Sequence, residues 1–246
     1  MAKTRSQLQI LLLQAREDEE TSLEEINEFV SFSRLGRDQF TALNMFATPN
    51  FTPNCVEGYD AVFVGGSSDA SVLAPEKFTF VEDCKKLLSY CVDQSVPVFA
   101  SCFGFQVVVV ALGGTVILDQ AGMEIGTFRM ELTAAAKTDL LFHDLPEDFW
   151  AIAGHKERAL TLPTGTVNLA ATALCPYHAL KIPGKPFYGF QFHPELTRAD
   201  LTKRLTRYCD RYLEHDQALQ EIISTLRDTP EANELINKFI ERILLS

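Results

Sequence analysis

The sequence predicts an α/β protein built on a parallel sheet with helices on both faces. Short apolar runs of the kind that form buried strands alternate with amphipathic helical segments from Leu8 to Leu112. This alternation needs crossover connections, which make neighbouring strands parallel. A length of 246 residues, with 46% hydrophobic and 22% charged residues, suits a globular protein with a sizeable core. We therefore expect a single domain over 1–246, with a core over 1–196 and a helical extension over 197–246.

The first part of the chain is expected to contain four strands and two amphipathic helices. The apolar runs predict strands over Leu8–Gln14, Phe40–Ala47, Ala61–Val64 and Val96–Ala100. Helical periodicity predicts helices over Ser22–Leu35 and Lys77–Ser95. Thr21 or Ser22 can cap the first helix, and Glu24 and Glu25 suit the positive end of its dipole.

The segment Phe103–Leu112 carries conflicting signals. Four consecutive valines, Val107 to Val110, favour a strand by propensity. The Gly113-Gly114 pair that follows Leu112 is typical of a helix C-terminus. We expect a buried helix here, with tertiary packing overriding the preference of the valines.

The second part of the chain reads as short strands followed by helices. Turn signals separate strands expected over Gly126–Leu132, Trp150–Gly154, Val167–Ala173, His178–Ile182 and Phe187–Phe192. From Thr197 the pattern is helical, with later helices over Gln217–Arg227 and Glu231–Leu245. The last helix has a broad apolar stripe, which we expect to pack on its own domain. The alternative, an interface with a partner or a second copy, leaves room for oligomerisation through the C-terminal helices.

The charge balance excludes several classes of partner. The formal net charge is −11, so we expect no binding to nucleic acid and no attraction to an anionic membrane. The longest early apolar run, Leu8 to Leu13, is too short to span a bilayer, and no signal-type cleavage site follows it. We therefore expect a soluble, cytoplasmic protein.

The pattern of cysteines and glycines predicts neither a metal nor a cofactor. None of the six cysteines forms a C-x-x-C pair, and no Cys/His group has zinc spacing. His143, His178 and His215 carry no functional signal. The sequence also lacks the glycine-rich motifs that bind nucleotides. Most of the cysteines are expected to be small buried hydrophobic residues.

Cys102 is the exception among the cysteines. It follows the apolar strand that ends at Ala100 and is followed after one residue by Gly104. A strand that turns sharply into a helix holds its turn residue exposed on a strained backbone. The helix N-terminus lowers the pKa of a thiol placed there, and the N–H of Phe103 would face an oxyanion beside the sulfur. We therefore predict that Cys102 is a nucleophile.

Two further segments complete a candidate site. His193 and Glu195 end another apolar strand, and the extended backbone that Pro194 favours places both side chains on one side. A carboxylate there would orient the imidazole. Gly66 follows the third strand and is expected to supply a second oxyanion donor, although a plain flexible loop fits equally well from the residues alone.

Taken together, these segments resemble the class I (triad-type) glutamine amidotransferases. The matching stretches are Val62–Ser67, Pro97–Gln106 (PVFASCFGFQ), Leu112–Gly114 and Gly189–Glu195 (GFQFHPE). The region from Glu124 to Pro146 is similar to stand-alone members related to the glutaminase part of GMP synthase. The resemblance implies a flavodoxin-like three-layer sandwich with a mostly parallel central sheet.

The resemblance also implies roles for single residues. Cys102 would attack the side-chain amide of glutamine, His193 would handle the proton, and Glu195 would orient His193. Gly66 and Phe103 would hold the oxyanion.

Two more residues are matched to the substrate pocket. Gln106 matches a substrate-contacting glutamine of the family, and His155 is either a pocket residue or part of a surface loop. The sequence departs from the family at Ala100, where the family has glycine, so we expect a tighter turn before the nucleophile.

The implied activity is hydrolysis of the glutamine γ-amide through a glutamyl thioester. The ammonia released would serve a partner synthetase, because the chain shows no ammonia-using domain of its own. A second hypothesis keeps the triad but has a γ-glutamyl peptide or conjugate as substrate. A third is a catalytically silent binding or regulatory protein on the same scaffold.

Overall fold

The computed structural model describes residues 3–208 and 216–246. A mixed sheet of nine strands, in the order β2-β1-β3-β4-β11-β10-β9-β6-β7, forms its centre. The five strands from β2 to β11 run parallel, and the remaining pairings are antiparallel. The parallel half carries the crossover helices, as the alternation of the sequence predicts.

The described strands and helices are short and closely spaced. The strands of the main sheet are β1 (Ile10–Gln14), β2 (Phe40–Asn44), β3 (Ala61–Val64), β4 (Val98–Ser101), β6 (Glu124–Leu132), β7 (Asp148–His155), β9 (Val167–Ala171), β10 (Ala179–Lys181) and β11 (Phe187–Phe190). The helices are α1 (Glu19–Ser33), α2 (Phe80–Gln94), α3 (Phe103–Ala111), α4 (Arg198–Arg207), α6 (Asp216–Thr225) and α7 (Pro230–Phe239), with a π-helical turn over Ile240–Leu244.

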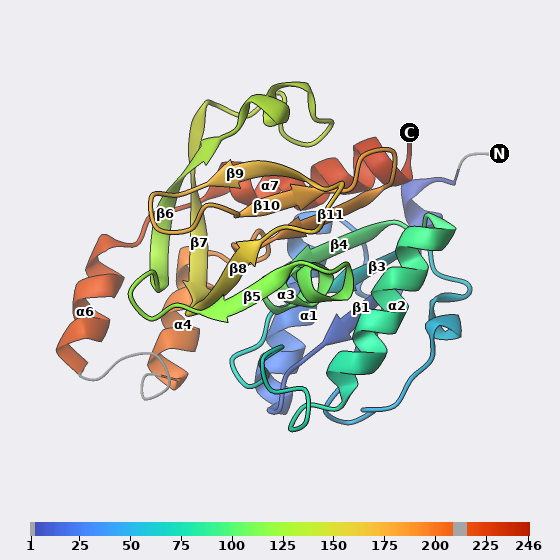
Figure 1. Ribbon diagram of the computed structural model, residues 1–246, viewed down its shortest axis with the longest axis horizontal. Helices are drawn as coiled ribbons and strands as arrows, with labels where there is room; N and C mark the ends of the chain where they lie inside the picture. The colour runs from blue at the N-terminus through green and yellow to red at the C-terminus, as the bar shows by residue number, and fades with distance from the viewer. Residues whose placement is uncertain (1–2, 209–215) are drawn as a thin grey trace.

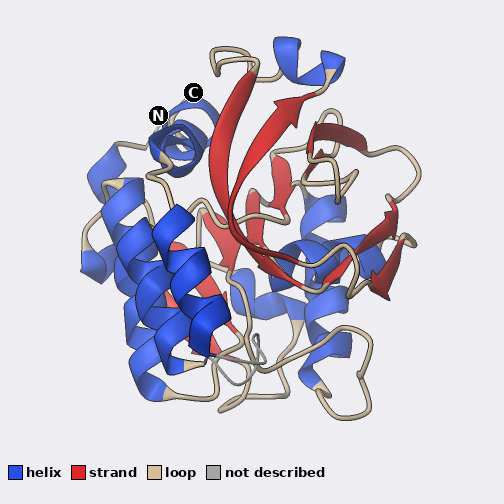
Figure 2. Ribbon diagram, turned by 90° about the vertical axis from the view of Figure 1, so that its left-hand side faces the viewer, coloured by secondary structure: helices blue, strands red, loops and turns tan. Residues whose placement is uncertain are grey.

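Helices cover both faces of the parallel half, so the predicted three-layer α/β fold is confirmed. On one face α1 and α7 pack against alternate residues of the strands, including Leu12 and Phe63. On the other face α2 and α3 pack against the intervening residues, such as Leu13 and Val64. Because every position of β1 and β3 is buried, these strands read as continuous apolar runs rather than alternating ones. Figure 2 shows the helices on either side of the strands.

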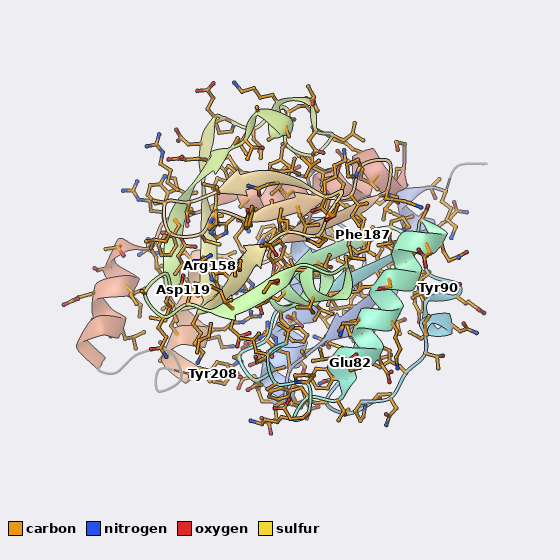
Figure 3. All side chains as sticks on the ribbon, viewed as in Figure 1. Glu82, Tyr90, Asp119, Arg158, Phe187 and Tyr208 are labelled. Carbon is orange, nitrogen blue, oxygen red and sulfur yellow. The ribbon has the colours of Figure 1, made fainter. Side chains whose placement is uncertain are left out.

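The antiparallel arm is the part of the fold that the sequence predicts least well. The long β6–β7 hairpin extends away from the helical layers (Figures 1 and 2). A separate two-stranded sheet pairs β5 (Thr115–Leu118) with β8 (Glu157–Thr161), neither of which the sequence analysis placed. The ion pair between Asp119 and Arg158, with 2.6 Å between Oδ2 and Nη2, holds the end of this sheet (Figure 3). Both strands are largely exposed, which explains their weak apolar signal.

Two expected helix starts are wrong, for a local reason. Helix α1 begins at Glu19, because the carboxylate of Asp18 accepts a hydrogen bond from the Thr21 N–H and caps it. Neither Thr21 nor Ser22 is the cap. Helix α2 begins at Phe80 rather than at Lys77. The disputed segment is helical, as expected: α3 spans Phe103–Ala111 and is almost wholly buried, so its valines are satisfied by packing.

The C-terminal helices pack on their own domain. Leu235, Ile236 and Phe239 of α7 lie in the core shared with α1 and the sheet. Helices α4 and α6 meet β7 through a smaller apolar cluster that includes Ile152, Leu205 and Leu219. The apolar stripe of α7 is therefore covered within the chain, and oligomerisation stays a prediction.

The remaining expectations about this region have a mixed outcome. His215 and Cys209 lie outside the described residues. Within residues 3–208 and 216–246, no helix combines the length and apolar character that a bilayer crossing requires.

Candidate active site

Cys102 occupies a strained turn between β4 and α3. Its backbone has φ 47° and ψ −101°, a conformation that side-chain-bearing residues rarely adopt. The Cys102 N–H donates to the Phe190 carbonyl at 2.7 Å, and its carbonyl accepts from the Gln106 N–H at 3.0 Å. The strained residue is thus fixed between β11 and the first turn of α3. The geometry matches the predicted strand–nucleophile–helix turn.

Close packing explains the glycine that follows. A Cβ at Gly104 would lie 2.8 Å from the carbonyl oxygen of Val64, so a larger residue would push α3 away from β3. The Gly104 N–H donates to the Gly65 carbonyl at 3.2 Å, which joins the turn to the Gly65-Gly66 loop. The two segments singled out in the sequence therefore support each other directly.

His193 and Glu195 lie together as predicted. Nδ1 of His193 is 2.7 Å from Oε1 of Glu195, and both side chains are buried. The His193 N–H donates to the Ile152 carbonyl of β7 at 2.8 Å. Asn233 of α7 donates to the carbonyls of Pro194 and Leu196 at 2.7 and 2.8 Å. A helix of the C-terminal extension therefore holds the His-Pro-Glu segment in place.

The charge on His193 is set by its two neighbours. Burial disfavours the imidazolium, but the Cys102 sulfur and the Glu195 carboxylate outweigh burial and raise the pKa of His193 to about 10. Burial likewise opposes the Glu195 carboxylate, and the charge of His193 overcomes it and lowers the pKa of Glu195. At neutral pH the proton therefore resides on His193, between a carboxylate and the sulfur.

The Gly65-Gly66 loop lies against His193. A Cβ at Gly66 would be 2.8 Å from Cε1 of His193 and 3.2 Å from Nη2 of Arg16, so this position tolerates no side chain without movement. Arg16 forms an ion pair with Glu25, with 2.7 Å between Nη2 and Oε1. Both charged side chains are buried under the loop, so Glu25 does not act as the exposed first-turn residue expected from sequence.

A cleft opens beside Cys102 and contains most of the predicted pocket residues. The residues that line it come from the loop after β3, the start of α3 and the β7–β8 turn: Ser67, Ser68, Ala70, Cys102, Phe103, Gln106, Gly154, His155, Lys156 and Glu157. The carboxamide of Gln106 donates to the Glu157 carbonyl at 2.9 Å, which fixes its side chain at the cleft. Gly66 is the predicted site residue that contacts His193 rather than lining this cleft.

His155 is not part of a surface loop. It is 4% exposed and ends β7, and its Nε2 lies 3.1 Å from Oε2 of Glu124. Burial, only partly offset by the bond to Glu124, lowers the pKa of His155, which keeps the ring neutral. Of the two alternatives from sequence, only the pocket position agrees with the structure.

Sequence reasoning assigned no role to several polar residues at the site. Ser101 donates to Oε1 of Glu195 at 3.2 Å, and the carboxamide of Gln191 lies 3.9 Å from the Cys102 sulfur. Both stand inside the motifs already singled out, so their positions next to the predicted triad were available signals. Arg16 and Asn233 carried no such signal, because only the fold brings them to the motifs.

Comparison with known proteins is consistent with this geometry. Residues 42–209 match the family model for "Glutamine amidotransferase class-I". One component of the two-part glutamine-hydrolysing GMP synthase of Methanocaldococcus jannaschii is 30% identical over 120 residues, which cover 49% of this chain and 62% of that protein. The GMP synthase of Aliivibrio fischeri is 35% identical over 125 residues, which cover 50% of this chain and 23% of that one. The chain thus spans less than two thirds of these relatives.

Solved structures show the same fold along nearly the whole chain. A glutamine amidotransferase from Thermotoga maritima superposes with a TM-score of 0.78 at 19% identity, covering 98% of this chain and 99% of that one. A glutamine amidotransferase from Methylobacillus flagellatus gives 0.68 at 19% identity, over 97% and 96% of the two chains. With the family model matching more than half of the sequence, the chain belongs to the class-I glutamine amidotransferase family of enzymes.

Proposed function

We propose that the chain hydrolyses the γ-amide of glutamine with Cys102 as nucleophile, His193 as acid–base and Glu195 as the residue that orients His193. The observation that carries the proposal is the strained turn at Cys102, beside a histidine that hydrogen-bonds a buried carboxylate at 2.7 Å. A cysteine held at a helix N-terminus and paired with an imidazolium is primed for attack on a carbonyl carbon.

The first half of the reaction forms a thioester. The Cys102 sulfur attacks the side-chain carbonyl carbon of glutamine and gives a tetrahedral oxyanion, which the N–H groups of Phe103 and Gly66 would stabilise. The C–N bond then breaks as His193 donates its proton to the departing nitrogen. Ammonia leaves and a glutamyl thioester remains on Cys102.

The second half regenerates the enzyme. His193, now neutral, takes a proton from water as the water oxygen attacks the thioester carbon. The C–S bond breaks, glutamate leaves, and the thiolate–imidazolium pair is restored. The buried Glu195 holds the same imidazole orientation through both halves, so one residue serves as acid and then as base.

The ammonia is proposed to pass to a separate synthetase. The name of the Methanocaldococcus jannaschii relative identifies it as one subunit of a glutamine-hydrolysing GMP synthase, which supports a partnered arrangement for this chain. We expect weak glutaminase activity from the chain alone. A partner that fixes the Gly65-Gly66 loop could align one oxyanion donor, an effect on the order of a hundredfold in rate.

The test is an assay of the purified chain against glutamine and a panel of γ-glutamyl peptides, with ammonia and free glutamate both measured. The proposal expects glutamate and ammonia in equal amounts from glutamine and loss of both in the Cys102→Ala variant. Robust cleavage of γ-glutamyl peptides with glutamine a poor substrate would replace it by the conjugate-hydrolase hypothesis. No turnover of any member by a folded protein would favour the silent scaffold.

A further inference from the structure

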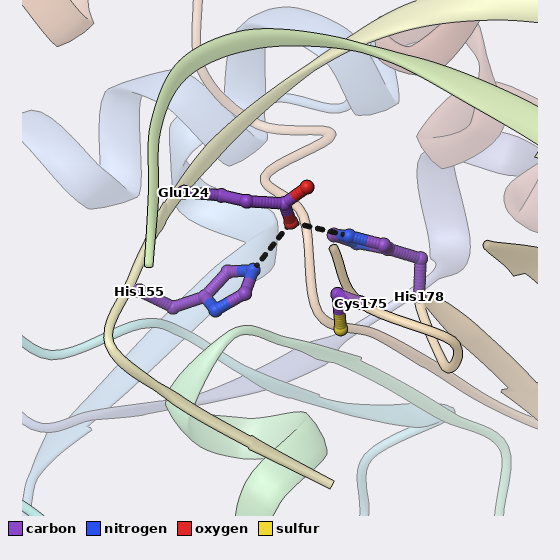
Figure 4. Close-up of side chains that lie close together, drawn as sticks. All are labelled: Glu124, His155, Cys175 and His178. Atoms are coloured by element: carbon purple, nitrogen blue, oxygen red, sulfur yellow. Dashed lines mark hydrogen bonds and ion pairs between the residues drawn. The ribbon is translucent and has the colours of Figure 1, made fainter. Parts of the chain in front are cut away.

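A second buried group of Cys, His and Glu side chains lies apart from the predicted triad. It consists of Glu124, His155, Cys175 and His178, and we refer to it as the β6–β10 cluster (Figure 4). One ligand-type atom from each residue lies within 4.8 Å of those of the other three, and all four side chains are buried. Sequence spacing gave no hint of it, because the residues come from two strands and a distant turn.

The fold fixes the positions of all four residues. Glu124 and His155 face each other in register on the antiparallel pair β6 and β7. Cys175 lies in the turn after β9, where its N–H and carbonyl both bond to Thr172. His178 precedes β10 and is held by backbone bonds to Ala170 and Gln191. The donors are therefore placed by the sheet rather than by flexible loops.

The orientation of the donors points to one common centre. Nε2 of His178 and Nε2 of His155 lie 2.6 and 3.1 Å from the same oxygen, Oε2 of Glu124. The other carboxylate oxygen accepts from the hydroxyl of Thr172 at 2.6 Å. Such an outer hydrogen bond orients a carboxylate that binds a metal through its remaining oxygen.

The charges also suit a divalent cation. Burial opposes the Glu124 carboxylate, but hydrogen bonds from the two imidazoles outweigh burial and lower its pKa to about 2, so it stays ionised. Among the described residues, the hydrogen-bond and ion-pair partners of Glu124 are Thr172, His155 and His178, and none is a lysine or arginine. A carboxylate, a thiolate and two neutral imidazoles supply two negative charges, which a divalent ion would neutralise in a buried site.

Binding of the ion would release a proton from His178. Burial opposes the imidazolium, but Cys175 and Glu124 outweigh burial and raise the pKa of His178 to about 9 in the metal-free protein. A ligating imidazole must be neutral, so the ion takes the place of this proton.

We propose that Glu124, His155, Cys175 and His178 form a structural binding site for a divalent transition-metal ion, with zinc the best match. Zinc takes four nitrogen, sulfur and oxygen ligands in a tetrahedron, with neighbouring ligand atoms about 3.3–3.6 Å apart. The present spread of up to 4.8 Å requires shifts on the order of 1 Å in the side chains. The ion would tie the turn that carries Cys175 to the β6–β7 hairpin, behind the cleft that His155 lines.

Cobalt binding tests the site with a readout other than activity. The background is the Cys102→Ser variant, so that the predicted nucleophile cannot supply the sulfur ligand. Chelator-stripped protein is titrated with Co²⁺, and the visible ligand-field bands and the near-ultraviolet thiolate charge-transfer band are recorded. The proposal expects one equivalent of cobalt, four-coordinate bands, a charge-transfer band, and displacement of cobalt by zinc.

Further variants in the same background identify the ligands. Adding Cys175→Ser should abolish the charge-transfer band, and adding His178→Gln should weaken cobalt binding at least about tenfold. Adding Cys55→Ser is the matched control, because this half-buried thiol lies outside the cluster, and the full spectrum should remain. Circular dichroism of the metal-free proteins checks that each variant folds.

Three results would overturn the proposal: no stoichiometric cobalt binding by the folded Cys102→Ser protein, binding without a charge-transfer band, or a full band after Cys175→Ser. In the first case the cluster is a hydrogen-bonded network only. None of these results bears on the glutaminase proposal, since no turnover is measured.

Discussion

The chain contains two buried groups built from the same three residue types, and their surroundings differ. The predicted triad of Cys102, His193 and Glu195 contains a cysteine at positive φ on a helix N-terminus, beside an open cleft. In the β6–β10 cluster, the residue at the centre is the carboxylate of Glu124, and no residue has a positive φ. The comparison teaches that backbone context, rather than residue type, separates a predicted nucleophile from a predicted ligand. A cysteine in a regular turn has no helix dipole to activate it.

The largest expected effect comes from removing the nucleophile. Cys102→Ala should lower kcat for glutamine by about 10⁴-fold or more, because the covalent route disappears and only binding and oxyanion stabilisation remain. Ammonia release measures it. The matched control is Cys55→Ser, which should retain turnover. Equal losses in both variants would erase the distinction drawn between cysteines.

Removing the two partners of Cys102 should give unequal losses. His193→Ala removes the proton carrier and should cost about as much as Cys102→Ala. Glu195→Gln leaves the imidazole in place but removes its orienting charge, so the expected loss is smaller, on the order of 10⁴-fold. The variant with both changes should be no worse than His193→Ala in steady-state kinetics. Losses that multiply would show that the two residues act separately.

Gly66→Ala should produce an intermediate effect. The added methyl group would contact the His193 ring and the Arg16 guanidinium, and so displace the loop that presents the Gly66 N–H. Loss of one oxyanion donor typically costs about 10²–10³-fold in kcat. Gly165→Ala is the control, because this exposed turn glycine has open space around it. An unchanged kcat in Gly66→Ala would exclude the loop from the oxyanion site.

The smallest expected effect is a pH dependence of stability. The pKa of His193 is raised from its ordinary 6.5 to about 10, so its stabilising contribution is complete below pH 6.5 and is lost as pH rises through 10. The difference in unfolding free energy between the wild-type protein and His193→Gln should therefore shrink from pH 6 to pH 10, as measured by urea denaturation. Cys102→Ser removes the sulfur and should shift this loss to lower pH. A difference that is independent of pH would contradict the charged state assigned to His193.

The predictable parts of the molecule are those in which the signal is local in sequence. The apolar runs before Cys102 and His193 end at the same edge of a parallel sheet, so two distant motifs could be brought together by topology alone. The helix at Phe103–Ala111 required one further step, because burial on all sides removes its periodicity.

The parts that could not be predicted depend on register and on long-range packing. Glu124 faces His155 only because β6 and β7 pair in one antiparallel register, and nothing in the sequence fixes that register. Asn233 reaches the His-Pro-Glu backbone across the packing of α7 on the domain. Buried ion pairs such as Arg16 with Glu25 look like surface charges in sequence, because their burial is a tertiary property.

The most direct test of the central claim is covalent labelling with a diazoketone analogue of glutamine, followed by peptide mass spectrometry. The analogue places an alkylating carbon where the amide of glutamine would be attacked, so it reports on the residue that performs the attack. The account predicts one adduct per chain, on the peptide that contains Cys102, protection by excess glutamine, and no adduct on Cys175. An adduct on another residue, or glutamine-insensitive labelling spread over several cysteines, would contradict it.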